Sequence, residues 1–198
     1  PSHAEARTVV IGLMLTMFLG ALDQTIVATA LPTMGRAFND IENLSWVVTA
    51  YLLTATASTP LYGKLSDIYG RRAIMLTALV IFIAGSVACA MAPSMTALIL
   101  ARALQGLGGG GLMSLTQTIV ADIVTPKERG RYQGYIGAVF ASSSIGGPVL
   151  GGVLTEHLHW SLIFWINLPL GLVALALTSS VLRRLPLTQR KHALDLPG

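Results

Sequence analysis

Six long apolar stretches alternate with short polar links along the chain. The second and third stretches, 44–62 and 73–91, contain no charged residue, and the ten residues between them carry three cations and one carboxylate. Because a helix rises about 1.5 Å per residue, about 20 apolar residues cross the roughly 30 Å hydrocarbon core of a bilayer. The pattern therefore predicts an all-α membrane protein, a bundle of six transmembrane helices. Their expected positions are about 8–31, 44–62, 73–91, 96–121, 130–154 and 160–182.

The expected domain organisation follows from these spans. Residues 1–182 form one six-span bundle, and residues 183–198 form a cytoplasmic linker that approaches a further span. The chain begins at Pro1 rather than at a methionine, so we expect sequence to be missing at its start as well as after Gly198.

Composition places the chain among membrane proteins. Apolar residues make up 53% of the chain and charged residues 11%, whereas an ordinary soluble domain has roughly 25% charged residues. The net charge of +4 does not indicate a nucleic-acid partner, because the cations lie between apolar stretches instead of on one soluble face. Cys89 is the only cysteine, so no disulfide can form within the chain.

The cations also predict the orientation in the membrane. They gather in the links on one side, and Arg36 alone lies on the other. The positive-inside rule therefore predicts a multi-pass membrane protein with both termini in the cytoplasm. The cations on the cytoplasmic side are Arg7, Lys64, Arg71, Arg72, Lys127, Arg129, Arg131, Arg183, Arg184, Arg190 and Lys191.

The spans fall into two groups of three that enter the membrane from opposite sides. This is the arrangement of two inverted three-helix repeats. The links at 92–95 and 155–159 are very short. We therefore expect the spans that they join to pack as antiparallel neighbours in a compact bundle.

Two ionisable residues lie well inside apolar stretches, Asp23 in the first span and Arg102 in the fourth. Residue counting places Asp23 roughly 13 Å and Arg102 roughly 10 Å below the outer ends of their spans. A buried charge is costly unless it is paired or hydrated. We hypothesise that the two side chains share a hydrated cavity and that protonation of Asp23 is coupled to substrate movement; a purely structural ion pair is the alternative.

Neutral polar residues near this pair complete the candidate site for proton coupling and substrate. They either bind protons and substrate or simply connect helices through hydrogen bonds. These residues are Gln24, Thr25, Gln105 and Tyr51.

The charged link between the second and third spans is a candidate conformational latch. Gly63 and Gly70 permit tight turns, and Asp67 can pair with Arg71. Asp122, at the inner end of the fourth span, is a further candidate partner for Arg71 or Arg72. The alternative is that these charges only determine topology.

The fifth span carries a stripe of small residues. Ser143, Gly147 and Gly151 recur every four residues, so another helix can approach closely, and Pro148 is expected to kink the span. Gly134 and Gly152 belong to the same segment. Either the stripe serves tight packing alone, or it seals one conformation against ion leak.

The sequence offers no basis for an enzyme. The glycine run 108–111 lacks the Gly-Lys-Ser/Thr ending of a phosphate-binding loop and lies within a span, so close helix packing is the better explanation. We expect no cofactor and no metal site, and a proton gradient as the energy source.

These motifs together resemble the major facilitator superfamily, and within it the drug:proton antiporters of the fourteen-span type. Gly63-x-Leu65-x-Asp67-x-x-Gly70-Arg71-Arg72 is similar to the signature loop between spans two and three, and Leu22-Asp23-x-Thr25-Ile26-Val27 to the first-span motif. Arg102-x-x-Gln105-Gly106 is similar to the fourth-span motif linked with proton coupling. Gly134 with Gly147-Pro148-x-x-Gly151-Gly152 resembles the fifth-span antiporter motif, although Ser143 stands where that motif usually has glycine.

The resemblance implies the N-terminal half of a proton-coupled exporter of drugs or other small amphipathic molecules in the cytoplasmic (inner) membrane. It implies a small-molecule substrate, protons, the lipid bilayer and a missing C-terminal half of six or eight spans as partners. An uptake symporter of the same superfamily and a membrane scaffold without transport activity are the alternatives.

Overall fold

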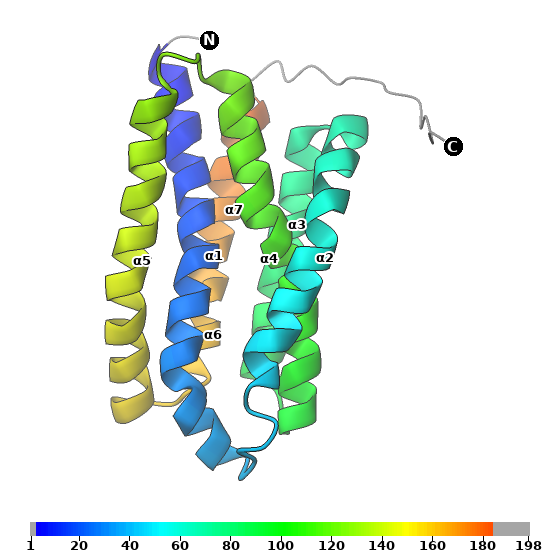
Figure 1. Ribbon diagram of the computed structural model, residues 1–198, viewed down its shortest axis with the longest axis vertical. Helices are drawn as coiled ribbons and strands as arrows, with labels where there is room; N and C mark the ends of the chain where they lie inside the picture. The colour runs from blue at the N-terminus through cyan, green and yellow to red at the C-terminus, as the bar shows by residue number, and fades with distance from the viewer. Residues whose placement is uncertain (1–2, 184–198) are drawn as a thin grey trace.

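The computed structural model describes residues 3–183, with side chains from residue 7 onward, and every regular element in that range is a helix. The predicted linker 183–198 lies outside the described residues except for Arg183. In chain order the helices are α1 (His3–Ala37), α2 (Trp46–Tyr69), α3 (Arg71–Ala90), α4 (Met95–Ile123), α5 (Arg129–His157), α6 (Leu162–Trp165) and α7 (Asn167–Arg183) (Figure 1).

The helices confirm the predicted all-α bundle. In the described part of the chain, five segments are long and apolar enough to cross a membrane, at Arg7–Ala37, Arg71–Ala90, Met95–Ile123, Arg129–His157 and Leu162–Arg183. The predicted second span lies in α2, which has 24 residues but is not among these five. Threonine and serine residues between its apolar ones make α2 less hydrophobic. It nevertheless runs along α4 within the bundle (Figure 1).

The sixth predicted span is interrupted. Ile166 separates the short α6 from α7, and Pro169 lies in the first turn of α7. A proline has no N–H to donate, and it is tolerated in the first turn of a helix, where that donor has no helical partner. The break leaves Asn167 at the start of α7, in the interior of the bundle.

The charged link is shorter than predicted. Gly63 was expected to form a turn, but it lies inside α2, which continues to Tyr69. Only Gly70 breaks the chain, with φ 97° and ψ 147°. A positive φ of this kind suits glycine, because a Cβ would be strained there. α3 begins at the next residue, so the link is a sharp corner between two helices.

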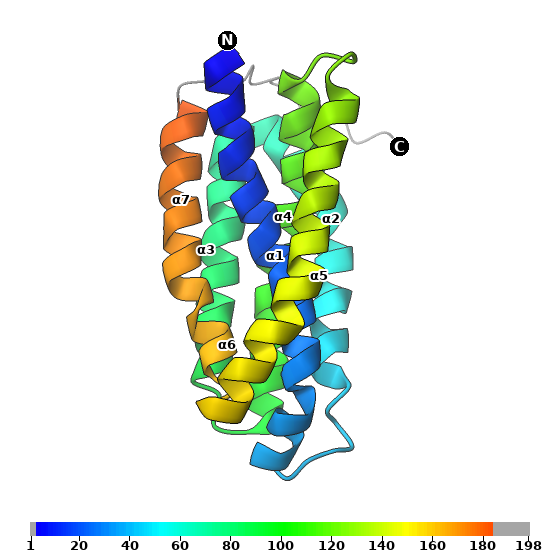
Figure 2. The same cartoon turned by 90° about the vertical axis from the view of Figure 1, so that its left-hand side faces the viewer.

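Two of the most extensive helix contacts are related to each other as the expected inverted repeat requires. The most extensive contacts join α2 to α4, α3 to α4, and α1 to α5. If α1 corresponds to α4 and α2 to α5, the α2–α4 and α1–α5 contacts are equivalent. Figure 2 shows α1 between α7 and α5, with α3, α4 and α2 behind them.

Glycines allow α4 to lie very close to both α2 and α3. A Cβ on Gly110 would approach the backbone of α2, and one on Gly108 would approach the backbone of α3. From the opposite side, a Cβ on Gly85 of α3 would lie 2.5 Å from the Cα of Gln105. The glycine run therefore serves close helix packing.

The apolar core consists of two clusters. One includes Leu19, Phe82 and Leu112, and the other includes Ile26 and Leu98. On α1 the residue between the two clusters is Asp23, and on α3, α4 and α7 the corresponding segments carry buried Ser86, Arg102, Gln105 and Asn167. A polar layer thus separates the two apolar clusters.

Candidate functional site

Asp23 on α1 and Arg102 on α4 form a buried ion pair. Their side chains are 0% and 1% exposed, and Arg102 Nη1 lies 2.7 Å from Asp23 Oδ2. The two charges therefore compensate each other where neither reaches water. The similar depths inferred by residue counting correspond to a direct contact between the side chains. The shared hydrated cavity expected from the sequence is wrong for this structure, because both side chains are buried and neither lines the cavity beside Tyr51 or the one between α1 and α5.

Neutral amides complete the coordination of the carboxylate. Gln105 Nε2 donates to Asp23 Oδ1 at 3.0 Å, and Asn167 Nδ2 reaches the same oxygen at 3.5 Å. Gln105 Oε1 accepts a 2.7 Å bond from Arg102 Nη1. Among the described residues, no buried side-chain nitrogen or oxygen lacks a hydrogen-bond partner. The cluster is therefore fully satisfied in this conformation.

The guanidinium of Arg102 also contacts α2. Its Nε donates to the carbonyl oxygen of Val47 at 2.9 Å, and its Cζ lies 4.3 Å from the ring centroid of Tyr51. An aromatic face attracts a cation, with greater effect where water is excluded. Arg102 thus connects α4 to both α1 and α2.

Asn167 and Ser86 were missed by the sequence reasoning, which considered the two charged groups inside spans and a few neutral residues on the first, second and fourth spans. Asn167 Nδ2 donates to Ser86 Oγ at 2.9 Å, and Ser86 Oγ donates to the carbonyl oxygen of Phe164 at 2.8 Å. This chain links the α6–α7 break to α3 and to Asp23. An uncharged amide just before a proline in an apolar span was the available signal.

A cavity of about 320 Å³ lies next to the cluster, between α1, α2 and α4. Gln24, Tyr51, Met113 and Gln117 are among its lining residues. Gln24 is exposed and points away from Asp23, because consecutive residues of a helix differ by about 100° in direction. Tyr51 is the residue that contacts the ion pair and also lines the cavity.

Thr25 lies at the contact with α5 rather than in the polar cluster. Its hydroxyl donates to the carbonyl oxygen of Ser143 at 2.9 Å. A Cβ on Gly147 would collide with the Thr25 side chain, and one on Gly151 would lie 3.1 Å from the carbonyl oxygen of Ile26. The small-residue stripe therefore faces α1 and determines how closely α5 approaches it.

The other residues of the fifth-span motif do not face α1 in the same way. A Cβ on Gly134 or Gly152 would have open space around it, and Pro148 is exposed. α5 is continuous through Pro148 from Arg129 to His157. The kink and the sealing role of these residues stay predictions.

Arg71 joins the ends of α2, α3 and α4. Its Nη1 lies 2.7 Å from Asp67 Oδ1, and its Nε lies 3.0 Å from Asp122 Oδ2. Arg71 also donates to Ser66 Oγ. The two carboxylates are 52% and 40% exposed, so water screens these pairs far more than the Asp23–Arg102 pair.

Arg72 does not share these carboxylates. Its Nε donates to the carbonyl oxygen of Ser179 at 3.1 Å, and its Nη2 donates to Ser179 Oγ at 2.7 Å. Arg72 therefore ties α3 to α7, a partner that spacing in the sequence did not indicate.

Comparisons with known proteins give one consistent assignment. Multidrug resistance protein 3 of Bacillus subtilis (strain 168) is 39% identical over 196 residues, which cover 99% of this chain and 38% of that protein. Multidrug transporter protein MdtP of the same organism is 44% identical over 169 residues, 85% of this chain and 31% of its own length. The chain thus spans about a third of the length of these relatives.

The fold is also found in a solved transporter structure. A crystal structure of a D-xylose-proton symporter superposes with a TM-score of 0.78 at 15% sequence identity, covering 92% of this chain and 49% of that chain. At this identity the likeness concerns the fold alone. The family model described as Major Facilitator Superfamily matches residues 13–196. The chain therefore belongs to the Major Facilitator Superfamily of transporters.

Proposed function

We propose that this chain forms the N-terminal half of a proton-coupled exporter of drugs or other small amphipathic molecules, of the fourteen-span antiporter type. The observation that carries the proposal is the buried Asp23–Arg102 pair beside a cavity. A relative named as an efflux pump, MMF1 of Pseudozyma antarctica (strain T-34), 45% identical over 196 residues, supports export as the direction. The proposed location is the cytoplasmic membrane, with both termini in the cytoplasm.

Proton binding to Asp23 supplies the coupling step. A proton on the carboxylate removes the countercharge of Arg102, and an unpaired buried cation is far more costly than a paired one. The guanidinium is then driven toward water or another anion. Because Arg102 contacts Tyr51, which lines the cavity, its movement changes the cavity wall.

The cavity itself suits a small amphipathic substrate. Tyr51 and Met113 offer apolar surface, while Gln24 and Gln117 offer amide donors and acceptors. Such a lining favours molecules with a large apolar body and few polar groups. In the complete transporter, a second half would enclose this cavity from the other side.

The contacts around Arg71 act as the latch of one conformation in this proposal. Arg71 bridges carboxylates on α2 and α4, so a relative movement of these helix ends must break one of the two pairs. The seam formed by Ser143, Gly147 and Gly151 against α1 closes the other side of the bundle.

The test is Asp23→Asn in the complete transporter. Everted membrane vesicles are energised with an imposed proton gradient, and substrate accumulation and substrate-driven proton release are recorded together. Asp23→Asn is expected to abolish proton release and gradient-driven accumulation while substrate still binds. Glu42→Gln serves as the matched control, because Glu42 is exposed and lies outside the site. Transport by Asp23→Asn at the parental rate would refute the proposal.

The same vesicles separate the alternatives. An antiporter moves substrate against the direction of proton flow, whereas an uptake symporter moves both in the same direction. A scaffold without transport activity gives no substrate flux with a gradient of either sign. Reversing the gradient therefore decides among the three functions.

A further inference from the structure

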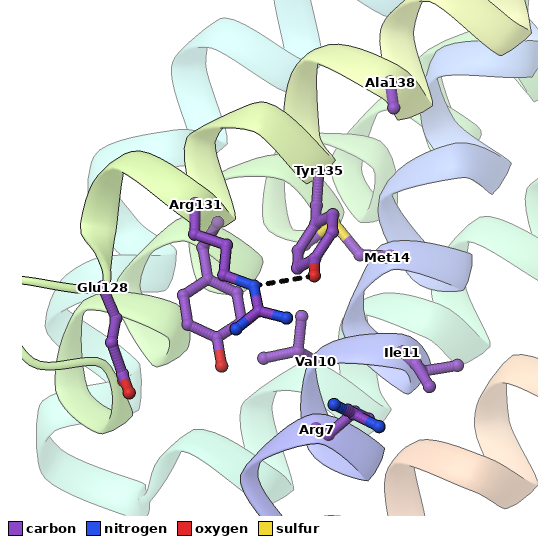
Figure 3. Close-up of a pocket in the computed structure, with 9 residues that line it drawn as sticks. Arg7, Val10, Ile11, Met14, Glu128, Arg131, Tyr135 and Ala138 are labelled. Carbon is purple, nitrogen blue, oxygen red and sulfur yellow. Dashed lines mark hydrogen bonds between the residues drawn. The ribbon is translucent and has the colours of Figure 1, made fainter. Parts of the chain in front are cut away.

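A second cavity, of about 460 Å³, lies between α1 and α5 near their N-terminal ends (Figure 3). It shares no lining residue with the cavity beside Tyr51, whose lining residue on α1, Gln24, lies farther along the helix. Neither the ion pair nor the latch makes use of it.

Two cations reach this cavity from different helices. Arg7 on α1 and Arg131 on α5 both line it, and Figure 3 shows their side chains extending toward the same space. Arg131 Nε donates to the hydroxyl oxygen of Tyr135 at 3.0 Å, which fixes the guanidinium and leaves its terminal nitrogens for a ligand. Glu128 is the one carboxylate in the lining, so the lining carries a net positive charge.

Apart from Tyr132 and Tyr135, the rest of the lining is apolar and extends deeper along both helices. Met14 follows Arg7 by seven residues and Ala138 follows Arg131 by seven, which places each about 10 Å below its cation. Val10 is buried between the helices, whereas Ile11 is 59% exposed. The site thus combines a cationic end at the level of the helix ends with an apolar wall toward the bilayer interior.

We propose that this cavity binds one anionic phospholipid from the leaflet next to the N-terminal ends of α1 and α5. Its phosphate lies between the guanidiniums of Arg7 and Arg131, and the Tyr135 hydroxyl donates a further hydrogen bond. One acyl chain lies along Ile11, Met14 and Ala138. Guanidinium groups match phosphate oxygens in charge and geometry, and basic side chains at a membrane surface attract anionic lipids. A soluble anion would leave the apolar wall unused.

The proposed lipid site is separate from the transport function. It is tested by measuring which phospholipid the purified chain retains. The purified chain in neutral detergent is mixed with equal amounts of phosphatidylglycerol and phosphatidylcholine with the same acyl chains, and bound lipid is measured by native mass spectrometry. The parent is expected to retain one phosphatidylglycerol in preference. Arg7→Gln/Arg131→Gln is expected to lose this preference, by about fivefold for each cation removed.

Two matched controls separate the site from general charge. Lys127→Gln/Arg129→Gln removes two cations at the same end of α5, neither of which lines the cavity, and is expected to keep the preference. Ala138→Trp fills the apolar part without changing charge and is expected to reduce retention of phosphatidylglycerol. Ala141→Trp, also exposed on α5 but outside the cavity, is expected to retain it.

Three outcomes would overturn the proposal. The first is a lipid preference that survives both Arg7→Gln/Arg131→Gln and Ala138→Trp. The second is an equal loss in the Lys127→Gln/Arg129→Gln control, which would indicate charge alone. The third is binding of inorganic phosphate with the same dependence on the two arginines and no dependence on Ala138, because the ligand would then be a soluble anion. Thermal unfolding of each variant shows whether a loss of lipid retention is due to misfolding. If Arg7→Gln/Arg131→Gln does not fold, Ala138→Trp alone still tests the proposal.

Discussion

The buried pair of Asp23 and Arg102 predicts a strongly non-additive double-mutant cycle. Arg102→Met keeps the approximate length of the side chain but removes its charge and its donors. The carboxylate of Asp23, which is 0% exposed, then stays in the core without a countercharge. Asp23→Asn/Arg102→Met removes both charges and keeps an acceptor for the Gln105 amide.

The magnitude follows from what each substitution leaves unpaired. Arg102→Met removes bonds to Val47, Asp23 and Gln105, at 2.9, 2.7 and 2.7 Å. Side-chain hydrogen bonds between membrane helices average only about 0.6 kcal/mol, so the stranded charge dominates the loss. Removing one partner of a buried pair costs about 3–5 kcal/mol. We expect the double variant to recover about 2–3 kcal/mol relative to the sum of the single variants.

The assay is SDS-induced unfolding in mixed micelles, followed by tryptophan fluorescence and circular dichroism. The four proteins of the cycle are compared under identical conditions, and the coupling free energy is taken from their midpoints and slopes. A double variant as unstable as the sum of its singles would refute the reasoning. So would a loss below about 1 kcal/mol for Arg102→Met, because the pair would then be hydrated rather than buried.

Three further predictions concern packing and the cation contact. Gly147→Ala is expected to destabilise the bundle by about 1–3 kcal/mol, because its Cβ collides with α1, whereas Gly146→Ala, with open space, is expected to be neutral or stabilising by the same unfolding assay. Gly85→Ala is expected to lower the midpoint of thermal unfolding, because its Cβ would collide with the α4 backbone. Gly63→Ala is expected to raise this midpoint or leave it unchanged, since its Cβ would meet nothing within 4 Å. Tyr51→Leu is expected to lower the free energy of unfolding by about 2 kcal/mol, because the aromatic face above the guanidinium is lost. Tyr51→Phe keeps this face and is expected to retain most of the stability in the same SDS titration.

The sequence was sufficient to predict the charged centre of the polar cluster. Asp23 and Arg102 are conspicuous because charges are rare inside apolar spans, and residue counting gave their similar depth. Gln105 follows Arg102 by three residues and therefore shares its helix face. Asn167 was not predicted, since a neutral amide gives a weaker signal and its position depends on the break between α6 and α7.

The link between α2 and α3 shows where sequence reasoning was wrong. Gly63 and Gly70 look alike as turn formers, but a glycine with charged neighbours can also continue a helix. In the structure α2 continues through Gly63 to Tyr69, and the corner then needs one positive φ, at Gly70. The Arg71–Asp122 contact was predicted because both residues lie at the same membrane face, whereas the Arg72–Ser179 contact depends on where α7 packs.

The Asp23–Arg102 pair lies between two groups of tightly packed helices. α4 is packed against α2 and α3 through glycines, and α1 is packed against α5 through the small-residue stripe. α1 and α4 share fewer contacts with each other than with these partners. The Asp23–Arg102 pair crosses this weaker contact, and the Gln105 bond to Asp23 crosses it as well. Substituting Asp23 therefore removes polar contacts from the boundary between the two helix groups.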